Sequence, residues 1–480
     1  MSTENGQSTN GVAPADGVTD AGKAPASSAD YGKTASFLAV GVGLTGVITY
    51  AYFLIASHTL SGHDYGQITV LWSAVFITIS ALYRPIEQLL SRHISERVVK
   101  GQSLSEPMRV ASLIQFGLSL LFTVLALALR GPIQNSLLEG NETLYWVFFT
   151  SVLFYAASYF ARGFLAGKQE FGLFVALILS ESCFRTIFAV LVAFSVLSGQ
   201  GAVAIGITAA PALSLLVVPF AFAHKAQKHK AAAAAAPVPA PAAGDAGFSL
   251  KHGGGFAAAV FLIMFSEQAF LNAGPLIIRG LQGATEAGII FNILMLARAP
   301  LQLFQSISTS ILPHLTSLHT SDDPDAPREF SHTVKMVLMG IVGFTALVAV
   351  VVLIAGPKCM HIAFGKEGTY ERLGLLLVTF GMGLYLASVT LNQACIAQGQ
   401  VRRAAVRWIT CAAIFIAWNF VPLVSNEQRR VEVGFLIAAG VLFLLLFWVY
   451  RHPHAHKGDT PQPGSSEELE ARLAMIDENV

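Results

Sequence analysis

Twelve long apolar stretches occupy most of this chain and decide what it can fold into. Each stretch can cross a bilayer, because about 20 residues at a rise of about 1.5 Å span the roughly 30 Å hydrocarbon core. Hydrophobic residues make up 54% of the chain and charged residues 12%, whereas soluble proteins carry about 25% charged residues. The sequence therefore predicts an all-α integral membrane protein. The expected spans are 35–57, 66–89, 109–129, 143–164, 172–197, 202–223, 256–278, 286–312, 333–356, 369–397, 404–424 and 432–450.

A basic linker rich in alanine and proline separates the first six spans from the last six. It covers residues 224–255, contains six consecutive alanines followed by "PVPAPAAGDAG", and carries four lysines. We therefore expect two six-helix lobes, joined on one side of the membrane. The expected parts are a disordered tail at 1–34, a first lobe at 35–223, the linker at 224–255, a second lobe at 256–450 and a tail at 451–480.

The distribution of lysine and arginine predicts the orientation. When basic residues at the ends of spans are counted with the adjoining loop, the tails, the linker and the loops after even-numbered spans hold 20 of them, and the loops after odd-numbered spans hold 7. Because basic residues favour the cytoplasmic side, both termini and the linker are expected in the cytoplasm. The first 33 residues lack the apolar core of a cleavable signal peptide.

Two motifs recur in the same order in both halves and indicate a duplication. From Gly66 to His93 is 27 residues, and from Gly288 to His314 is 26. The motif "GFLAGKQ" closes the fourth span of the first half, and "ACIAQGQ" closes the fourth span of the second. Because six crossings return the chain to its starting side, the halves must be parallel repeats around an axis normal to the membrane.

These segments resemble a known family. The run "SGHDYGQITVLWSAVFITISALYRPIEQLLSRHISE" is similar to the first hairpin of the polysaccharide exporters in the multidrug/oligosaccharidyl-lipid/polysaccharide (MOP) flippase superfamily. "RGFLAGKQEFGLF" and "LNQACIAQGQ" resemble that branch's motifs after the fourth and tenth spans. The resemblance covers about residues 35–450. It implies a MATE-like architecture of two lobes around a central cavity that opens alternately to each side.

The resemblance also implies a function and a location. The expected activity is the flipping of a lipid-linked oligosaccharide, of the undecaprenyl-diphosphate type, across the bacterial cytoplasmic membrane in polysaccharide or cell-envelope biosynthesis. The expected partners are the lipid-linked glycan, membrane lipids, and a polysaccharide polymerase or glycosyltransferases. Nucleic acid is not expected, because no basic run with interleaved aromatic residues is present. Relatives with fourteen spans carry the peptidoglycan precursor lipid II, and the sequence offers no thirteenth or fourteenth span.

Arg84 and Glu87 are the first of six charged residues that are expected to lie within the membrane and to need a partner there. A charge near the bilayer centre costs at least about 2.5–3.5 kcal/mol, so it must face protein, water or a partner. Arg84 and Glu87 lie three residues apart and share a helical face, and Pro85 between them predicts a kink. The pair could neutralise itself, or Arg84 could line the cavity and bind a diphosphate in a bidentate manner.

Glu181 and Arg185 form a second pair, spaced i, i+4 in the fifth span. This spacing favours a salt bridge. The bridge could serve only to make the helix insertable. Alternatively, it could break as the lobes move and act as a gate, with Arg185 contributing to substrate binding.

Arg298 and Glu267 lack an oppositely charged residue within a helical turn. Arg298 in the eighth span would make the cavity cationic together with Arg84, which suits an anionic diphosphate. Glu267 in the seventh span could titrate and couple transport to H⁺ or Na⁺, or it could pair with an arginine across the cavity. Five amides are expected mainly as interhelical hydrogen-bond partners: Asn272, Asn292, Gln302, Gln305 and Asn392.

Other function classes remain as alternatives. An enzyme is not expected, because no loop carries a plausible catalytic cluster. The four cysteines show no metal-binding spacing, so neither a metal site nor a cofactor is expected. The alternatives are a lipid II flippase, a MATE-type cation-coupled drug exporter, which would favour acidic groups in its cavity, and a transport-inactive scaffold.

Overall fold

The computed structural model describes residues 28–99, 102–216, 219, 250–296, 326–365 and 370–452, and these residues are helical without any strand. Each of the twelve expected spans contains a helix over its described residues, counting α2 and α3 as one span; the spans 202–223 and 286–312 are described only in part. Nine spans of the described residues meet length and hydropathy criteria for crossing a membrane. The expected all-α membrane fold is therefore confirmed. Arg298, Gln302, Gln305, most of the linker and most of both tails lie outside the described residues.

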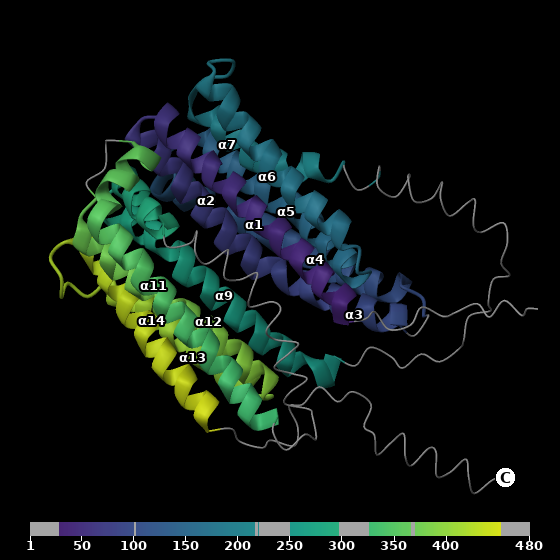
Figure 1. Ribbon diagram of the computed structural model, residues 1–480. Coiled ribbons are helices and arrows are strands. Elements are labelled where there is room, and N and C mark those ends of the chain that lie inside the picture. Colours follow the sequence, from purple (N-terminus) through teal and green to yellow (C-terminus); the bar gives the residue numbers. More distant parts are fainter. Residues whose placement is uncertain are drawn as a thin grey trace, which may run out of the picture.

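The first lobe is formed by the helices coloured purple to teal-blue in Figure 1. Their bounds are α1 (Ser28–Thr59), α2 (Gly62–Leu82), α3 (Arg84–Val99), α4 (Ser105–Ala128), η1 (Pro132–Leu137), α5 (Glu142–Gly167), α6 (Phe171–Ala193) and α7 (Gly199–Ser214).

The second lobe is formed by the helices coloured teal-green to yellow (Figure 1). Their bounds are α9 (Leu250–Leu281), a short apolar helix at Ala284–Leu296, α11 (Ala326–Phe364), α12 (Arg372–Ala397), α13 (Val401–Trp418) and α14 (Glu427–Arg451). The helix α9 begins within the segment expected to be the linker, before the glycines at 253–255. A glycine costs a helix only about 1 kcal/mol, so this run does not force the helix to end.

Side-chain caps fix where several helices begin. The hydroxyl of Ser61 accepts a hydrogen bond from the backbone N–H of Asp64 at 3.1 Å, and the side chain of Asn141 accepts one from Leu144 at 3.1 Å. Asn426 caps α14 in the same way. Each cap satisfies a backbone donor that has no partner inside the helix.

The second span is interrupted where the sequence predicted a kink. The segment Gly62–Val98 forms one apolar span, but α2 ends at Leu82, Tyr83 is a turn, and α3 begins at Arg84. Pro85 occupies the second position of α3, where its missing N–H costs no hydrogen bond. The break places Arg84 and Glu87 in the first turn of a new helix.

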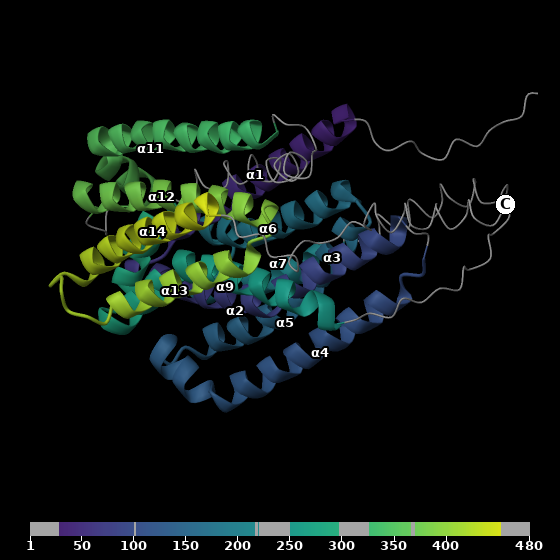
Figure 2. The ribbon, with the colours of Figure 1, turned by 90° about the horizontal axis from the view of Figure 1, so that it is seen from below.

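The two lobes pack their helices in the same pattern. In the first lobe α1 packs along α6 and α5 along α7; in the second α9 packs along α13 and α12 along α14. The third helices of the two halves, α4 and α11, lie at opposite outer edges of the bundle (Figure 2) and are largely exposed. The lobes meet mainly where α2 packs against α9. This pattern is that of two parallel six-helix lobes.

Candidate functional site

A buried charge cluster lies inside the first lobe. The Glu181 carboxylate on α6 accepts a charged hydrogen bond from Arg162 Nη2 on α5 at 2.5 Å and another bond from the Ser158 hydroxyl at 3.2 Å. Arg185 Nη2, one turn further along α6, lies 3.8 Å from the same carboxylate. Glu181 and Arg185 are both almost fully buried. The i, i+4 pairing is present, but Arg162 is the closer partner.

Arg185 is held by an aromatic ring as well as by Glu181. Its guanidinium carbon lies 4.6 Å from the centroid of the Trp72 ring on α2, a geometry that attracts a cation to the ring face. Arg185 Nε and Nη1, Arg162 Nε and the Tyr155 hydroxyl are buried without a hydrogen-bond partner in the described residues. A buried polar group without a hydrogen-bond partner costs free energy. A water molecule or a side chain that moved to bond these groups would therefore stabilise the cluster.

Arg84 and Glu267 face each other across the lobes. Arg84 begins α3 of the first lobe, Glu267 lies on α9 of the second, and the two are close enough to interact electrostatically. Glu87 interacts with both Arg162 and Arg84. Arg84, Glu87 and Glu267 all retain accessible surface although they belong to apolar spans. Both hypotheses for Glu267, ion coupling and pairing with an arginine, remain predictions.

The second lobe buries aromatic residues on the helices that correspond to α5 and α6. The rings of Tyr385 on α12 and Trp408 on α13 pack around Phe270 of α9. Trp408 Nε1 donates a hydrogen bond to Asn392 at 3.1 Å, which joins α13 to α12. The charge cluster of the first lobe therefore has an aromatic counterpart in the second.

The lobes are joined at one end of the bundle, which we call the distal end. It carries the turns between α1 and α2, between α9 and the helix Ala284–Leu296, and between α13 and α14, opposite the described chain ends at Ser28 and His452. A Cβ atom on Gly66 would lie 1.9 Å from the carbonyl oxygen of Ala284, so the backbones touch here. Tyr65 donates a hydrogen bond to Asn292 Oδ1 at 2.5 Å, which also crosses the seam.

An ion pair reinforces the distal end. Arg279, at the end of α9, lies 3.0 Å from Glu139 in the loop after η1 and donates hydrogen bonds to the carbonyls of Leu137 and Ser136. His63 and Gln67 of α2 contact the other carboxylate oxygen at 2.6 Å each. Burial opposes ionisation of Glu139, but the Gln67 hydrogen bond and the charges of Arg279 and His63 outweigh it and hold the pKa of Glu139 below its ordinary value.

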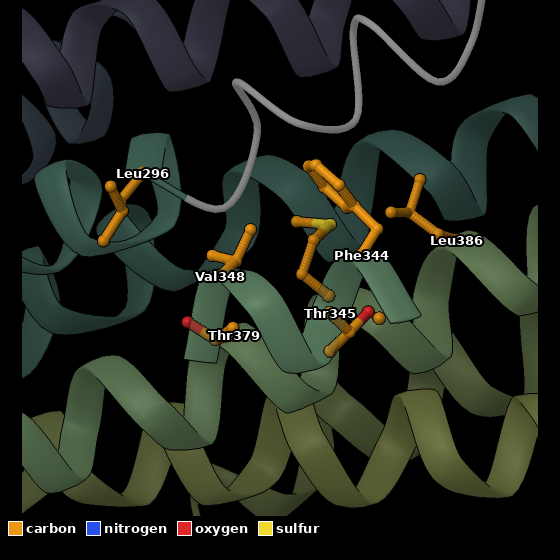
Figure 3. Close-up of a pocket in the computed structure, with 8 residues that line it drawn as sticks. Leu296, Phe344, Thr345, Val348, Thr379 and Leu386 are labelled. Atoms are coloured by element: carbon orange, nitrogen blue, oxygen red, sulfur yellow. The ribbon is translucent and has the colours of Figure 1, made fainter. Parts of the chain in front are cut away.

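Two further features bear on ligand binding: a small cavity in the second lobe and the distribution of metal-binding side chains. A cavity of about 20 Å³ between α11 and α12 is lined mainly by apolar side chains such as Leu296, Phe344 and Val348 (Figure 3). Its volume accommodates about one water molecule, so it is a packing defect rather than a binding site. The described residues contain no group of three or more His, Cys, Asp or Glu side chains that could hold a metal ion.

Similar solved structures were found, although no family model and no curated protein matches the sequence. The eukaryotic MATE transporter AtDTX14 has 14% identity and a TM-score of 0.59, covering 88% of this chain and 96% of that one. The chain has a MATE-like fold. The MATE multidrug transporter DinF-BH in complex with R6G matches with 15% identity and a TM-score of 0.59, covering 87% and 95%. An inward-facing multidrug resistance MATE family transporter of the MOP superfamily matches with 12% identity and a TM-score of 0.55, covering 87% and 97%.

Within this MATE-like fold, the five predicted site residues that the structure describes fall into two groups. Arg84 and Glu267 approach each other from the two lobes. Glu87, Glu181 and Arg185 lie within the first lobe, where the backbone of Glu87 packs against Gly163 of α5. Their functional roles remain predictions. Arg162 was not among the predicted site residues: it lies inside the expected span 143–164 but was counted with the basic residues of the loop that follows. The pair Glu139 and Arg279 was also missed, because its contact leaves no local signal in the sequence.

Proposed function

We propose that this multi-pass membrane protein is a transporter that works by alternating access, and that it exports amphipathic organic molecules. The observation that carries this proposal is the MATE-like fold of two parallel lobes. Arg84 and Glu267, one from each lobe and both in apolar spans, are also close enough to interact electrostatically. A charge pair of this kind is strongly favourable only when both partners are present and close. Separation of the lobes would therefore expose two charges to water or to a substrate.

The contacts at the distal end are suited to opening. Across the seam they consist of glycine backbone contacts, the Tyr65–Asn292 hydrogen bond and the Arg279–Glu139 pair. Polar groups at such a seam can exchange their partners for water with a small net change in free energy. In one state of an alternating-access cycle, the lobes are closed at one end of the bundle and charged residues lie further inside. The closed distal end and the pair Arg84 and Glu267 fit such a state.

Charge balance favours export of a drug-like molecule over the anionic cargo expected from the sequence. Three arginines (Arg84, Arg162, Arg185) are matched by three carboxylates (Glu87, Glu181, Glu267). Glu267 offsets the charge of Arg84, so the described part of the seam is not cationic. Such a seam accepts neutral or weakly cationic substrates without a large electrostatic cost.

The second candidate is a flippase for a lipid-linked oligosaccharide. The motifs around Gly66, Gly163 and Ala394 favour it, because they resemble those of polysaccharide exporters. Arg298 would add a positive charge to the cavity in that case. A lipid II flippase is a narrower version of the same candidate.

Transport in proteoliposomes distinguishes the two cargo classes. Rhodamine 6G and a fluorescent polyprenyl-diphosphate sugar are offered separately, each under imposed H⁺ and Na⁺ gradients. We expect gradient-driven movement of rhodamine 6G, at least ten-fold slower in Glu267→Gln and partly restored when Arg84→Glu is combined with Glu267→Arg. The control is Glu142→Gln, an exposed carboxylate at the start of α5. Movement of the diphosphate sugar alone would establish the flippase instead, and movement of neither compound would contradict the transporter.

A further inference from the structure

A second cavity, of about 310 Å³, lies at the seam of the lobes near the distal end. The turn between α1 and α2 forms one wall, and the helix Ala284–Leu296 with the end of α11 forms the other. That space is many times the roughly 10–15 Å³ that one water needs, so the cavity is larger than a single ion and has room for a sugar ring.

The described lining of the cavity carries hydrogen-bonding groups but no acidic or lysine or arginine side chain. The polar side chains that line it are Ser57, His58, Tyr65, Thr285, Asn292 and Tyr370. Hydroxyl, amide and imidazole groups of this kind pair with the hydroxyl groups of a ligand. The described lining therefore suits a neutral ligand with several hydroxyl groups.

Three buried residues form a hydrogen-bond chain that crosses from the first wall to the second. Tyr65 donates to Asn292 Oδ1 at 2.5 Å, and Asn292 Nδ2 donates to the Tyr370 hydroxyl at 3.0 Å. Because Tyr370 accepts in this chain, its own hydroxyl proton is left to donate. The chain orients the amide and both phenol rings, so a ligand meets preorganised groups.

The wall formed by the turn between α1 and α2 can supply a hydrogen-bond acceptor. His58 Nδ1 lies 2.8 Å from the carbonyl oxygen of Leu54, so this nitrogen carries the proton in the neutral ring. The other ring nitrogen is then an acceptor. The rings of Phe364, Tyr65 and Tyr370 add apolar faces. Aromatic faces together with neutral donors and acceptors match a sugar ring, which has apolar C–H faces and hydroxyl groups along its edge.

We propose that this cavity binds a neutral, hydroxyl-rich ligand of monosaccharide size, and that the bound ligand holds the lobes together at the distal end. The second part rests on the proposed alternating access. Because both lobes contribute to the lining, the complete site exists only while the distal end is closed. A ligand that binds one state of an equilibrium increases the population of that state.

The binding test uses the full chain in lipid nanodiscs, with glucose, galactose and N-acetylglucosamine as neutral probes and choline and sulfate as charged ones. Isothermal titration is expected to detect at least one of the sugars and neither ion. Tyr370→Phe, which removes only a hydroxyl group, should weaken the binding about 5–20-fold, as expected for one hydrogen bond. Ser57→Trp, which fills the cavity, should abolish it. Tyr450→Phe on α14 is the matched control and should bind as the original chain does.

The conformational test follows the distance between spin labels at Val196 of the first lobe and Gln282 of the second, both exposed. In the original chain, added sugar should increase the share of molecules with the shortest distance between the two labels. In Tyr370→Phe the distance distribution should not change. Absence of sugar binding at tens of millimolar, equal binding by Tyr370→Phe and Tyr450→Phe, or binding of choline or sulfate would overturn the site. Binding without any change in the distances would overturn the link to closure. Transport of rhodamine 6G without sugar is measured separately, so a failure here does not decide the proposed function.

Discussion

Gly66 and Gly288 meet backbone to backbone at the junction of the two lobes: a Cβ atom built on Gly288 would lie 3.1 Å from the Cα of Gly66. These glycines occupy equivalent positions in the repeated motif. Equivalent residues of two parallel repeats can touch only near the axis that relates the repeats. The axis therefore passes between Gly66 and Gly288, and closure of the distal end depends on the absence of side chains there.

Gly66→Ala should weaken the junction. The new methyl group would lie 1.9 Å from the Ala284 carbonyl oxygen, so the helices must move apart, at a typical overpacking cost of about 1–3 kcal/mol. Thermal unfolding in detergent should therefore begin at a lower temperature. Gly117→Ala on α4, where a Cβ meets no atom within 4 Å, is the matched control and should have an unchanged or slightly raised Tm. Equal behaviour of the two variants would argue against a tight junction.

Acidification should loosen the distal end through Glu139. Because the folded-state pKa of Glu139 is lowered, its ionised form stabilises the closed arrangement above the ordinary value of 4.5, and this contribution is lost as the pH falls through the lowered pKa. The hydrogen-exchange protection factor of the segment 136–140, which corrects for the pH dependence of the intrinsic exchange rate, should be constant down to about pH 4.5 and fall below it.

Two variants separate this effect from general acid unfolding. Glu139→Gln should have a low protection factor in the segment 136–140 at every pH, because the glutamine amide cannot form the ion pair with Arg279. Glu142→Gln removes a nearby carboxylate that pairs with Arg130 within the first lobe, and its pH profile should match that of the original chain. A pH step that persists in Glu139→Gln would assign the effect to another group.

Arg162→Met should be one of the most destabilising single changes in the first lobe. It leaves Glu181 buried with only Arg185 at 3.8 Å, and loss of one partner of a buried ion pair costs about 3–5 kcal/mol. Adding Glu181→Gln should recover part of the lost thermal stability, because the uncompensated charge is then removed. Arg92→Met, at an exposed i, i+4 pair, should have little effect. Additive losses in the double variant would contradict the pairing.

The sequence predicted the helices well because the bilayer imposes a length and a composition on each of them. Pro85 also marked the break in the second span, since a proline restricts the backbone in any environment. The spacing of the motifs identified Gly66 and Gly288 as equivalent but not as neighbours, because contact depends on where the axis passes.

The partners of the charged residues could be predicted only where they were local. Glu181 and Arg185 lie one turn apart on one helix, so the pair was visible in the sequence. Arg162 was not recognised as its third member, because its contact with Glu181 depends on how α5 packs against α6. The pair Glu139–Arg279 depends on the packing of two lobes that are far apart in sequence.

The central claim is that the distal end opens and closes, and the distance between spin labels at Val196 and Gln282 tests it most directly. The measurement is made in lipid nanodiscs, with the four cysteines replaced, with and without rhodamine 6G, and again in Arg279→Ala. Our account predicts two populations, with the longer distance favoured in Arg279→Ala and the balance shifted by rhodamine 6G. A single distance that stays the same in all of these conditions would contradict it.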